Sequence, residues 1–170
     1  HPVAHSFPTR RSSDLEIPKD MQGIPLKGVI ENDTPVREAL LFGLHGGHVN
    51  ITDGRYVYMR APEAENKPLF NYTHMPTHMR NMFSVDEMKT VELAGPFPFT
   101  KGCKTRKIES ALWGGGRIPF RTMLFDCEQD PAQENPIDNP IVEKRLTGQM
   151  KELMRENDAP PEQFQRLGLN

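Results

Sequence analysis

The sequence predicts an α+β fold in which a small antiparallel sheet packs against a C-terminal helix. Two β-rich runs that flank an Asp-Gly pair at 53–54, and a compact apolar run at 121–128, indicate the sheet. Asn139-Pro140 indicates the start of the helix, because apolar residues follow it at three- and four-residue steps. Several strands followed by a helix are typical of the α+β class.

The first predicted strands lie within residues 37–62. An apolar run, ALLFGL, precedes HGGH, VNIT, the Asp-Gly pair and RYVYMR. Asp-Gly between two such runs favours a type I′ hairpin, because both central residues must tolerate positive φ. The tyrosines of the last run alternate with Val57 and Met59, so we expect one buried face and one half-exposed face. This segment therefore predicts an antiparallel meander.

The next segment predicts one strand and one short helix. Residues 69–82 should form a strand that leads into a loop, because Pro76 would interrupt a helix there. Ser84 and Glu87 match the S-x-x-E capping box, which predicts a short helix after Ser84 with Met88 turned inward.

Two stretches rich in proline and glycine predict irregular structure. We expect residues 16–32 to form a connecting loop with a short turn. Residues 95–119 should be mostly loop, with a strand or a brief turn at 104–112. The apolar run at 121–128 then supplies the last strand, and the Asp-Pro pair at 130–131 ends it.

The C-terminal helix has the clearest pattern in the sequence. Its expected inward-facing residues are Val142, Leu146, Met150, Leu153 and Met154, and charged residues fall mainly on its other side. After it, the segment DAPPE at 158–162 is expected to cap a short final helix that ends at Gly168.

Composition argues against two classes of protein. The 170 residues carry a formal net charge of −2, and phosphate recognition needs a clustered basic face, so no nucleic-acid partner is expected. No apolar run approaches the roughly 20 residues that cross a bilayer, so no membrane partner is expected.

Cys103 and Cys127 lack CxxC spacing, which leaves only a structural disulfide open. Sixteen prolines and a mean hydropathy of −0.63 suggest a subdomain that leans on an absent part.

The N-terminal segment, residues 1–15, has neither the apolar core of a signal peptide nor the period of a helix or strand. Its part HSFPTRRSSDL, at 5–15, resembles the translation of a widely used DNA-sequencing adapter. We therefore expect residues 1–15 to be a non-native artefact and the native sequence to begin near Glu16, with the gene continuing upstream. The alternative is a disordered basic arm.

Three phrases in order resemble the C-terminal end of bacterial sulfatases of the arylsulfatase type, which belong to the alkaline-phosphatase-like superfamily. IPKDMQGIPL at 17–26 is similar to the family phrase dmqGrSL, with Pro25 where serine is usual. HVNITDGRYVYMR at 48–60 is similar to aVrdgryKYi. TMLFDCEQDPAQENPI at 122–137 is similar to eLYDLenDPgEtnNL, with Cys127 in a commonly apolar place, and it is the most specific of the three.

The resemblance covers nearly all of residues 16–170 and implies a domain organisation. Residues 16–36 would be a linker from a missing N-terminal catalytic domain of the same chain. Residues 37–170 would be the sulfatase C-terminal subdomain of an alkaline-phosphatase-like α/β fold. The parent would hydrolyse sulfate esters of a small substrate with a formylglycine and with calcium or another divalent metal.

The resemblance also implies that the chemistry lies upstream. Formylglycine forms from Cys or Ser in a C-x-P-S-R or S-x-P-S-R motif, and neither GCKTR around Cys103 nor FDCEQ around Cys127 matches it. We therefore expect no catalytic residue and no metal ligand in this chain, and no turnover from it alone. A cytoplasmic location is favoured, although the missing native N-terminus leaves the compartment open.

Seven residues are candidates for substrate contact in the completed pocket: His45, His48, His74, His78, Lys101, Lys104 and Trp113. The histidines could face the mouth of the upstream active site, or could be ordinary surface or half-buried loop residues. A four-histidine metal site is disfavoured, because neither histidine pair has a fixed helical face. The lysines could present cations to an anionic substrate or be solvated. The tryptophan could stack on an aromatic or sugar ring or plug the sheet edge.

Two other functions stay open from the sequence. A phosphonate monoester or phosphodiester hydrolase of the same superfamily would share this region and differ in pocket residues. A freestanding carbohydrate-binding or interaction module would fold cooperatively by itself and bind a ligand.

Overall fold

The computed structural model describes residues 23–110 and 119–170. The chain divides after Glu38 into two compact units. The adapter-like segment 1–15 and Trp113 lie outside the described residues.

The described part of the first unit contains one helix, α1 (Lys27–Asn32). The loop predicted over 16–32 is therefore wrong at its C-terminal end. The helix ends at Asp33, which adopts a left-handed φ of 54° and donates its N–H to the carbonyls of Gly28 and Val29. No residue of α1 is buried, and Ile30 is 78% exposed. A helix without an apolar face produces no periodic pattern, which is why the sequence did not indicate it.

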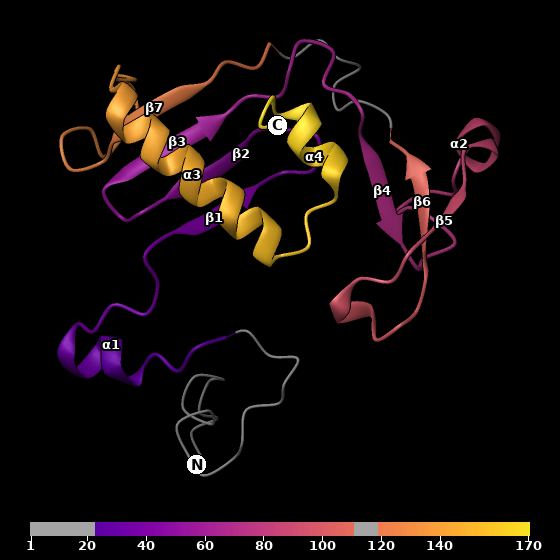
Figure 1. Ribbon diagram of the computed structural model, residues 1–170, viewed down its shortest axis with the longest axis horizontal. Helices are drawn as coiled ribbons and strands as arrows, with labels where there is room; N and C mark the ends of the chain where they lie inside the picture. The colour runs from indigo at the N-terminus through magenta and orange to yellow at the C-terminus, as the bar shows by residue number, and fades with distance from the viewer. Residues whose placement is uncertain (1–22, 111–118) are drawn as a thin grey trace. The chain divides into compact units, whose positions relative to one another are not determined.

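The second unit contains a four-stranded antiparallel sheet in the order β1-β2-β3-β7 (Figure 1). Its strands are β1 (Leu40–Gly43), β2 (Val49–Thr52), β3 (Tyr56–Arg60) and β7 (Met123–Asp126). The predicted meander and the predicted last strand are confirmed. The register places Tyr58 opposite Ile51 on one side and opposite Leu124 on the other.

The turn between β2 and β3 differs from the predicted type I′ turn. Gly54 has a φ of 95°, but Asp53 does not share the positive φ that this turn type needs. Instead, the Asp53 carboxylate accepts hydrogen bonds from the backbone N–H groups of Arg55, at 3.0 Å, and Tyr56, at 2.7 Å. Local side-chain bonding of this kind competes with the regular hairpin turn.

Strand β3 also differs from its predicted alternation. Val57 and Tyr58 are both buried, with exposed fractions of 8% and 2%. Tyr58 belongs to the core cluster, and Val57 lies opposite Phe125, which is 4% exposed. The prediction of a half-exposed face is wrong here, because the centre of the sheet is covered on both faces.

The helix α3 (Pro140–Glu156) packs across one face of this sheet (Figure 1). Asn139 caps it as predicted, since its Oδ1 accepts the Val142 N–H at 3.2 Å. The predicted inward face is confirmed: Leu146, Met150 and Met154 are buried, and Val142 and Leu153 are partly buried against the core. The core cluster consists of Ile51, Tyr58, Leu124, Leu146, Met150, Met154, Leu167 and Leu169.

The short final helix, α4 (Pro161–Arg166), is also present, but its predicted cap is wrong. Pro160 occupies the N-cap position, and no side chain caps the helix. Asp158 instead follows the end of α3 in a left-handed conformation, with a φ of 57°. Gly168 has a φ of 61° and lies between Leu167 and Leu169, both of which enter the core.

A second antiparallel sheet, which the sequence did not predict, has the order β4-β6-β5. It consists of β4 (Phe70–Thr73), β5 (Glu92–Ala94) and β6 (Thr105–Glu109). The predicted strand within 69–82 and the strand alternative within 104–112 are confirmed. A short 3-10 helix, η2 (Pro98–Thr100), lies between β5 and β6.

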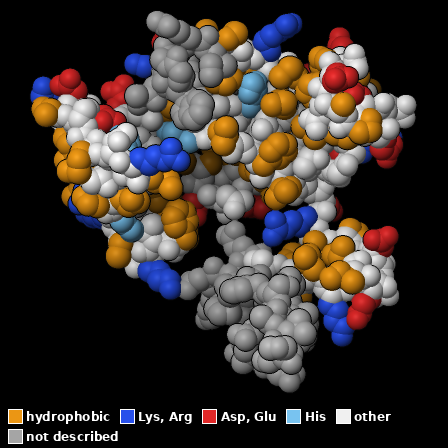
Figure 2. All heavy atoms as spheres, turned by 180° about the vertical axis from the view of Figure 1, so that it is seen from behind, with side chains coloured by type: hydrophobic (Ala, Val, Ile, Leu, Met, Phe, Trp, Pro, Cys, Tyr) orange, Lys and Arg blue, Asp and Glu red, His pale blue; other side chains and the backbone are white. Residues whose placement is uncertain are grey.

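The predicted capped helix, α2 (Val85–Lys89), is confirmed beside this sheet. The Ser84 Oγ accepts the Glu87 N–H at 3.2 Å, and a Glu87 carboxylate oxygen accepts the Ser84 N–H at 2.7 Å. Met88 is 50% exposed, so its predicted inward orientation is wrong. Residues 75–99 contribute several exposed apolar side chains, among which Met79 is 92% exposed. Figure 2 shows apolar and charged side chains interspersed on one face of the molecule.

Candidate functional site

Arg166 of α4 holds the β1–β2 loop, which carries the first two candidate histidines. Its side chain is buried, and its NH1 donates to the carbonyl of Gly47, at 3.1 Å, and to Asn66 Oδ1, at 2.8 Å. Its Nε donates to Gln163 Oε1 at 3.0 Å. Asn66 in turn donates its Nδ2 to the carbonyl of Gly46 at 2.8 Å. Both loop glycines are therefore held through their carbonyl groups.

The Arg166 guanidinium has no ion-pair partner among the described carboxylates. Burial lowers the pKa of this group, although it stays far above neutrality. Neutral oxygens satisfy its hydrogen bonds in place of a carboxylate. We therefore regard Arg166 as a clamp between α4 and the loop.

His45 and His48, the two histidines of this loop, each contact a neighbouring residue through Nε2. The Nε2 of His45 lies 3.1 Å from Ser110 Oγ, and burial, followed by the positive charge of Arg166, lowers the pKa of His45. His45 is therefore neutral at physiological pH. The Nε2 of His48 lies 2.9 Å from the Arg121 carbonyl, which can only accept, so this nitrogen carries a hydrogen.

The other two candidate histidines belong to the segment between β4 and α2. The Nε2 of His78 lies 2.7 Å from Glu87 Oε1, and its ring lies 4.2 Å from that of Phe83. His74 is exposed. Among the described residues, no hydrogen bond or ring contact joins this histidine pair to His45 and His48. The four histidines are held by different elements.

The candidate lysines Lys101 and Lys104 are exposed near the start of β6. In the part of the chain that the structure describes, no group of three or more His, Cys, Asp or Glu side chains could hold a metal ion. Cys103 and Cys127 are free thiols, so the disulfide that the sequence left open is not formed.

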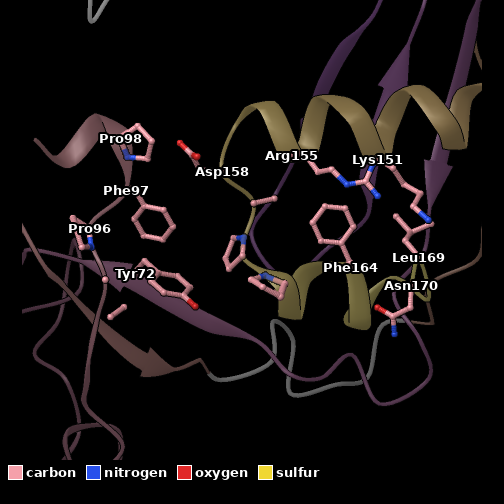
Figure 3. A pocket seen from close by; sticks show the side chains of 15 residues that line it. Tyr72, Pro96, Phe97, Pro98, Lys151, Arg155, Asp158, Phe164, Leu169 and Asn170 are labelled. Atoms are coloured by element: carbon pink, nitrogen blue, oxygen red, sulfur yellow. The ribbon is translucent and has the colours of Figure 1, made fainter. Parts of the chain in front are cut away.

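A groove of about 750 Å³ combines residues that are far apart in the sequence (Figure 3). Its size lies in the range of small-molecule sites. The residues that matter chemically are Tyr72, Phe97, Lys151, Arg155, Asp158 and Phe164. The sequence interpretation missed all six, because they come from separate segments of the chain that no local pattern joins. The signal that could have indicated them is the pair of cations four residues apart, followed by Pro-Pro and an aromatic residue.

One wall of the groove carries two aromatic rings. Tyr72 and Phe97 pack edge to face, with ring centroids 5.2 Å apart and an interplanar angle of 83°. The Tyr72 hydroxyl donates to the carboxylate of Glu162, which also lies 3.2 Å from the Nζ of Lys107. Burial, followed by the bond to Glu162, raises the pKa of Tyr72, so its hydroxyl stays protonated. The Tyr72 ring is thereby fixed while its hydroxyl is occupied.

The opposite wall carries two cations. Lys151 and Arg155 are four residues apart on α3 and therefore share one face of the helix. The Arg155 guanidinium lies 5.6 Å from the ring centroid of Phe164. Neither cation forms an ion pair with a described carboxylate. Figure 3 shows these side chains on the side of the groove away from Tyr72 and Phe97.

A separate cluster of charges lies where β3 meets β7. Arg55 donates from Nε, at 3.2 Å, and from NH2, at 2.8 Å, to Asp126 Oδ2. The hydrogen bonds from Arg55 lower the pKa of the Asp126 carboxyl. Arg145 of α3 lies 2.6 Å from the Asp53 carboxylate at the preceding turn. These pairs fasten the hairpin to β7 and to α3.

No protein-family model, no curated protein and no solved structure matches the chain. No helix within the described ranges is long and apolar enough to cross a membrane. The described residues form a groove with aromatic and cationic walls, and several structural ion pairs.

Proposed function

We propose that this chain is the C-terminal part of a sulfatase of the alkaline-phosphatase-like superfamily, where it completes the fold and the substrate pocket of a catalytic domain. One observation carries the proposal. Two of the three resembling phrases, 48–60 and 122–137, contain the antiparallel neighbours β3 and β7. The Arg55–Asp126 ion pair joins one phrase directly to the other.

The residues shared with the family phrases have a structural explanation. Asp126 Oδ1 accepts the Glu128 N–H at 3.1 Å, and Asp130 Oδ2 accepts the Asn135 N–H at 2.7 Å. These bonds turn the chain from β7 toward the start of α3. Both aspartates therefore stabilise this turn through side-chain bonds to backbone N–H groups. This supports a shared architecture and assigns the phrase no chemical step.

The reaction that the resemblance implies would use a formylglycine and a divalent metal, and the described residues can supply neither the formylglycine nor the metal ligands. Neither cysteine has the Pro-Ser-Arg context that formylglycine formation requires, and no described cluster suits a divalent metal. The proposal therefore gives this chain the role of scaffold and pocket wall. The loop around Gly46 and Gly47, fixed by Arg166, is a candidate pocket wall.

A chimaeric enzyme tests the proposal. The C-terminal region of a bacterial sulfatase that has a C-x-P-S-R motif would be replaced, from its dmqGrSL phrase onward, by residues 16–170. We expect the chimaera to hydrolyse an aryl sulfate, while the 170-residue chain alone does not. The same chimaera with Asp126→Asn should lose soluble yield, whereas Glu128→Gln, at the exposed edge of the cluster, should not.

Two results would overturn the proposal. The first is hydrolysis of the aryl sulfate by the isolated chain. The second is a soluble, folded chimaera without activity, when the recipient enzyme with its own C-terminal region is active. Independently, the genomic reading frame upstream of Glu16 should encode a Cys- or Ser-x-Pro-Ser-Arg motif.

A further inference from the structure

We propose that the groove between β4, the segment before η2 and the α3–α4 corner binds a small aromatic anion, with its ring against Tyr72 and Phe97 and its anionic group at Lys151 and Arg155. This inference is independent of the proposed function. The groove is made entirely of described residues of one chain. Its occupant follows from three features of the walls.

The aromatic wall favours a flat ring over an aliphatic chain. Two perpendicular rings present one face and one edge to the same space, and aromatic ligands gain from both arrangements. The Tyr72 hydroxyl already donates to Glu162. The ring of Tyr72, and not its polar end, is therefore the part available to a ligand.

The cationic wall favours an anionic substituent. Lys151 and Arg155 extend from one face of α3 and are not neutralised by an ion pair with any described carboxylate. The guanidinium of Arg155 lies over the Phe164 ring, which restricts its orientation before a ligand arrives. A planar guanidinium binds carboxylate, sulfonate or sulfate oxygens through parallel hydrogen bonds.

The acids near the groove do not favour a cationic ligand. Glu162 is occupied by Tyr72 and Lys107, and those bonds lower its pKa overall although burial acts to raise it. Asp158 is then the one acidic side chain among the lining residues. The lining side chains carry two cations and one carboxylate, which favours an anion, although the terminal carboxylate of Asn170 offsets part of that positive charge.

The full chain, labelled with ¹⁵N, would be titrated with 2-naphthalenesulfonate and followed by NMR. Two control probes separate the contributions: 2-naphthol keeps the ring without the charge, and methanesulfonate keeps the charge without the ring. We expect the naphthalenesulfonate to bind at least about tenfold more tightly than either control probe, since each loses one wall of the groove. Amide signals of Ala94, Gly95 and Ala159, which line the groove, should shift.

Matched variants test each wall. Arg155→Gln should weaken binding about three- to tenfold, while Lys144→Ala, on the same helix but outside the groove, should not. Phe97→Ala should weaken binding, while Phe42→Ala, at a 45% exposed position outside the lining, should have little effect. Asp158→Asn should tighten binding of the sulfonate, because it removes the one acidic side chain, and asparagine tolerates the left-handed backbone there.

The inference is wrong if 2-naphthol binds as tightly as the sulfonate, or if the shifted amides lie away from the groove. It is equally wrong if Lys144→Ala weakens binding as much as Arg155→Gln. None of these results involves hydrolysis, so they leave the sulfatase proposal unaffected. Conversely, an inactive chimaera would leave this binding site intact.

Discussion

The guanidinium of Arg166 is a buried cation whose hydrogen bonds go to neutral oxygens. Carbonyl and amide oxygens from three separate segments accept from its guanidinium. An arginine can do this because its planar fork reaches several acceptors at once. The clamp joins α4 to a loop that precedes it by more than a hundred residues, a pairing that no local sequence pattern could indicate.

Replacing this clamp should destabilise the protein strongly. Arg166→Met fills similar volume but leaves the Gly47 carbonyl and the Asn66 amide without a donor, so we expect the free energy of unfolding to fall by about 2–4 kcal/mol. Urea unfolding measures the change. Arg80→Met, at an exposed position, is the control and should change stability by less than about 0.5 kcal/mol. Equal stability of both variants would mean that water replaces the guanidinium.

Asp126 makes stability depend on pH in a defined direction. Its folded-state pKa lies below the ordinary value of about 3.9, chiefly because of the hydrogen bonds from Arg55. The stabilisation is therefore complete above the unfolded-state pKa and is lost as the pH falls through the folded-state pKa.

The pH dependence can be measured against Asp126→Asn. The difference in unfolding free energy between the unmodified chain and this variant should stay constant from about pH 8 to pH 6 and shrink below about pH 4. Glu128→Gln removes a carboxylate whose side chain is 61% exposed, so the unfolding free-energy difference for this variant should depend much less on pH. A difference that persists unchanged to about pH 3 would contradict the assigned role.

Helix α3 shows how local signals decide an element. Asn139 and Pro140 set its start, and the apolar steps set its buried face, so the sequence alone predicts it correctly. The capped helix α2 is predicted for the same reason. By contrast, α1 has no buried face and β5 has three residues, so neither produces a pattern.

The N-cap of α3 should contribute measurably to stability. Asn139→Ala removes the acceptor for the Val142 N–H and should cost about 1 kcal/mol of unfolding free energy. Asn139→Asp keeps an acceptor at this position and should retain most of the stabilisation. Urea unfolding followed by far-UV circular dichroism distinguishes the two. Identical losses in both variants would show that the cap bond does not stabilise the helix.

At the scale of the whole molecule, the α+β class could be predicted, but the division into two sheets could not. The second sheet pairs residues 70–73 with 105–109, which are separated by helix α2, strand β5 and the 3-10 helix η2. Alternating apolar residues reveal strands but do not specify such distant partners. The groove escaped prediction for the same reason, because its walls come from β4 and from α3.

The core beneath α3 should dominate global stability. Leu146 is fully buried in the cluster between helix and sheet, so Leu146→Ala should cost about 2–5 kcal/mol of unfolding free energy. Ile141 lies on the same helix and is 83% exposed, so Ile141→Ala should cost little. Urea midpoints of both variants provide the measurement. A small effect at Leu146 would contradict packing of α3 on the sheet.

The chain segment that contains the second sheet begins at the end of strand β3 and ends at the start of the neighbouring strand β7. Strand β3 ends at Arg60, β7 begins at Met123, and the Ala61 N–H donates to Thr122 Oγ1 at 3.2 Å. Topologically, residues 61–122 are one long insertion between adjacent strands. The entropy cost of closing such a connection grows only with the logarithm of its length. Changes in the length of this insertion beyond Asn66, which Arg166 holds, can therefore alter one wall of the groove without rebuilding the sheet that α3 covers.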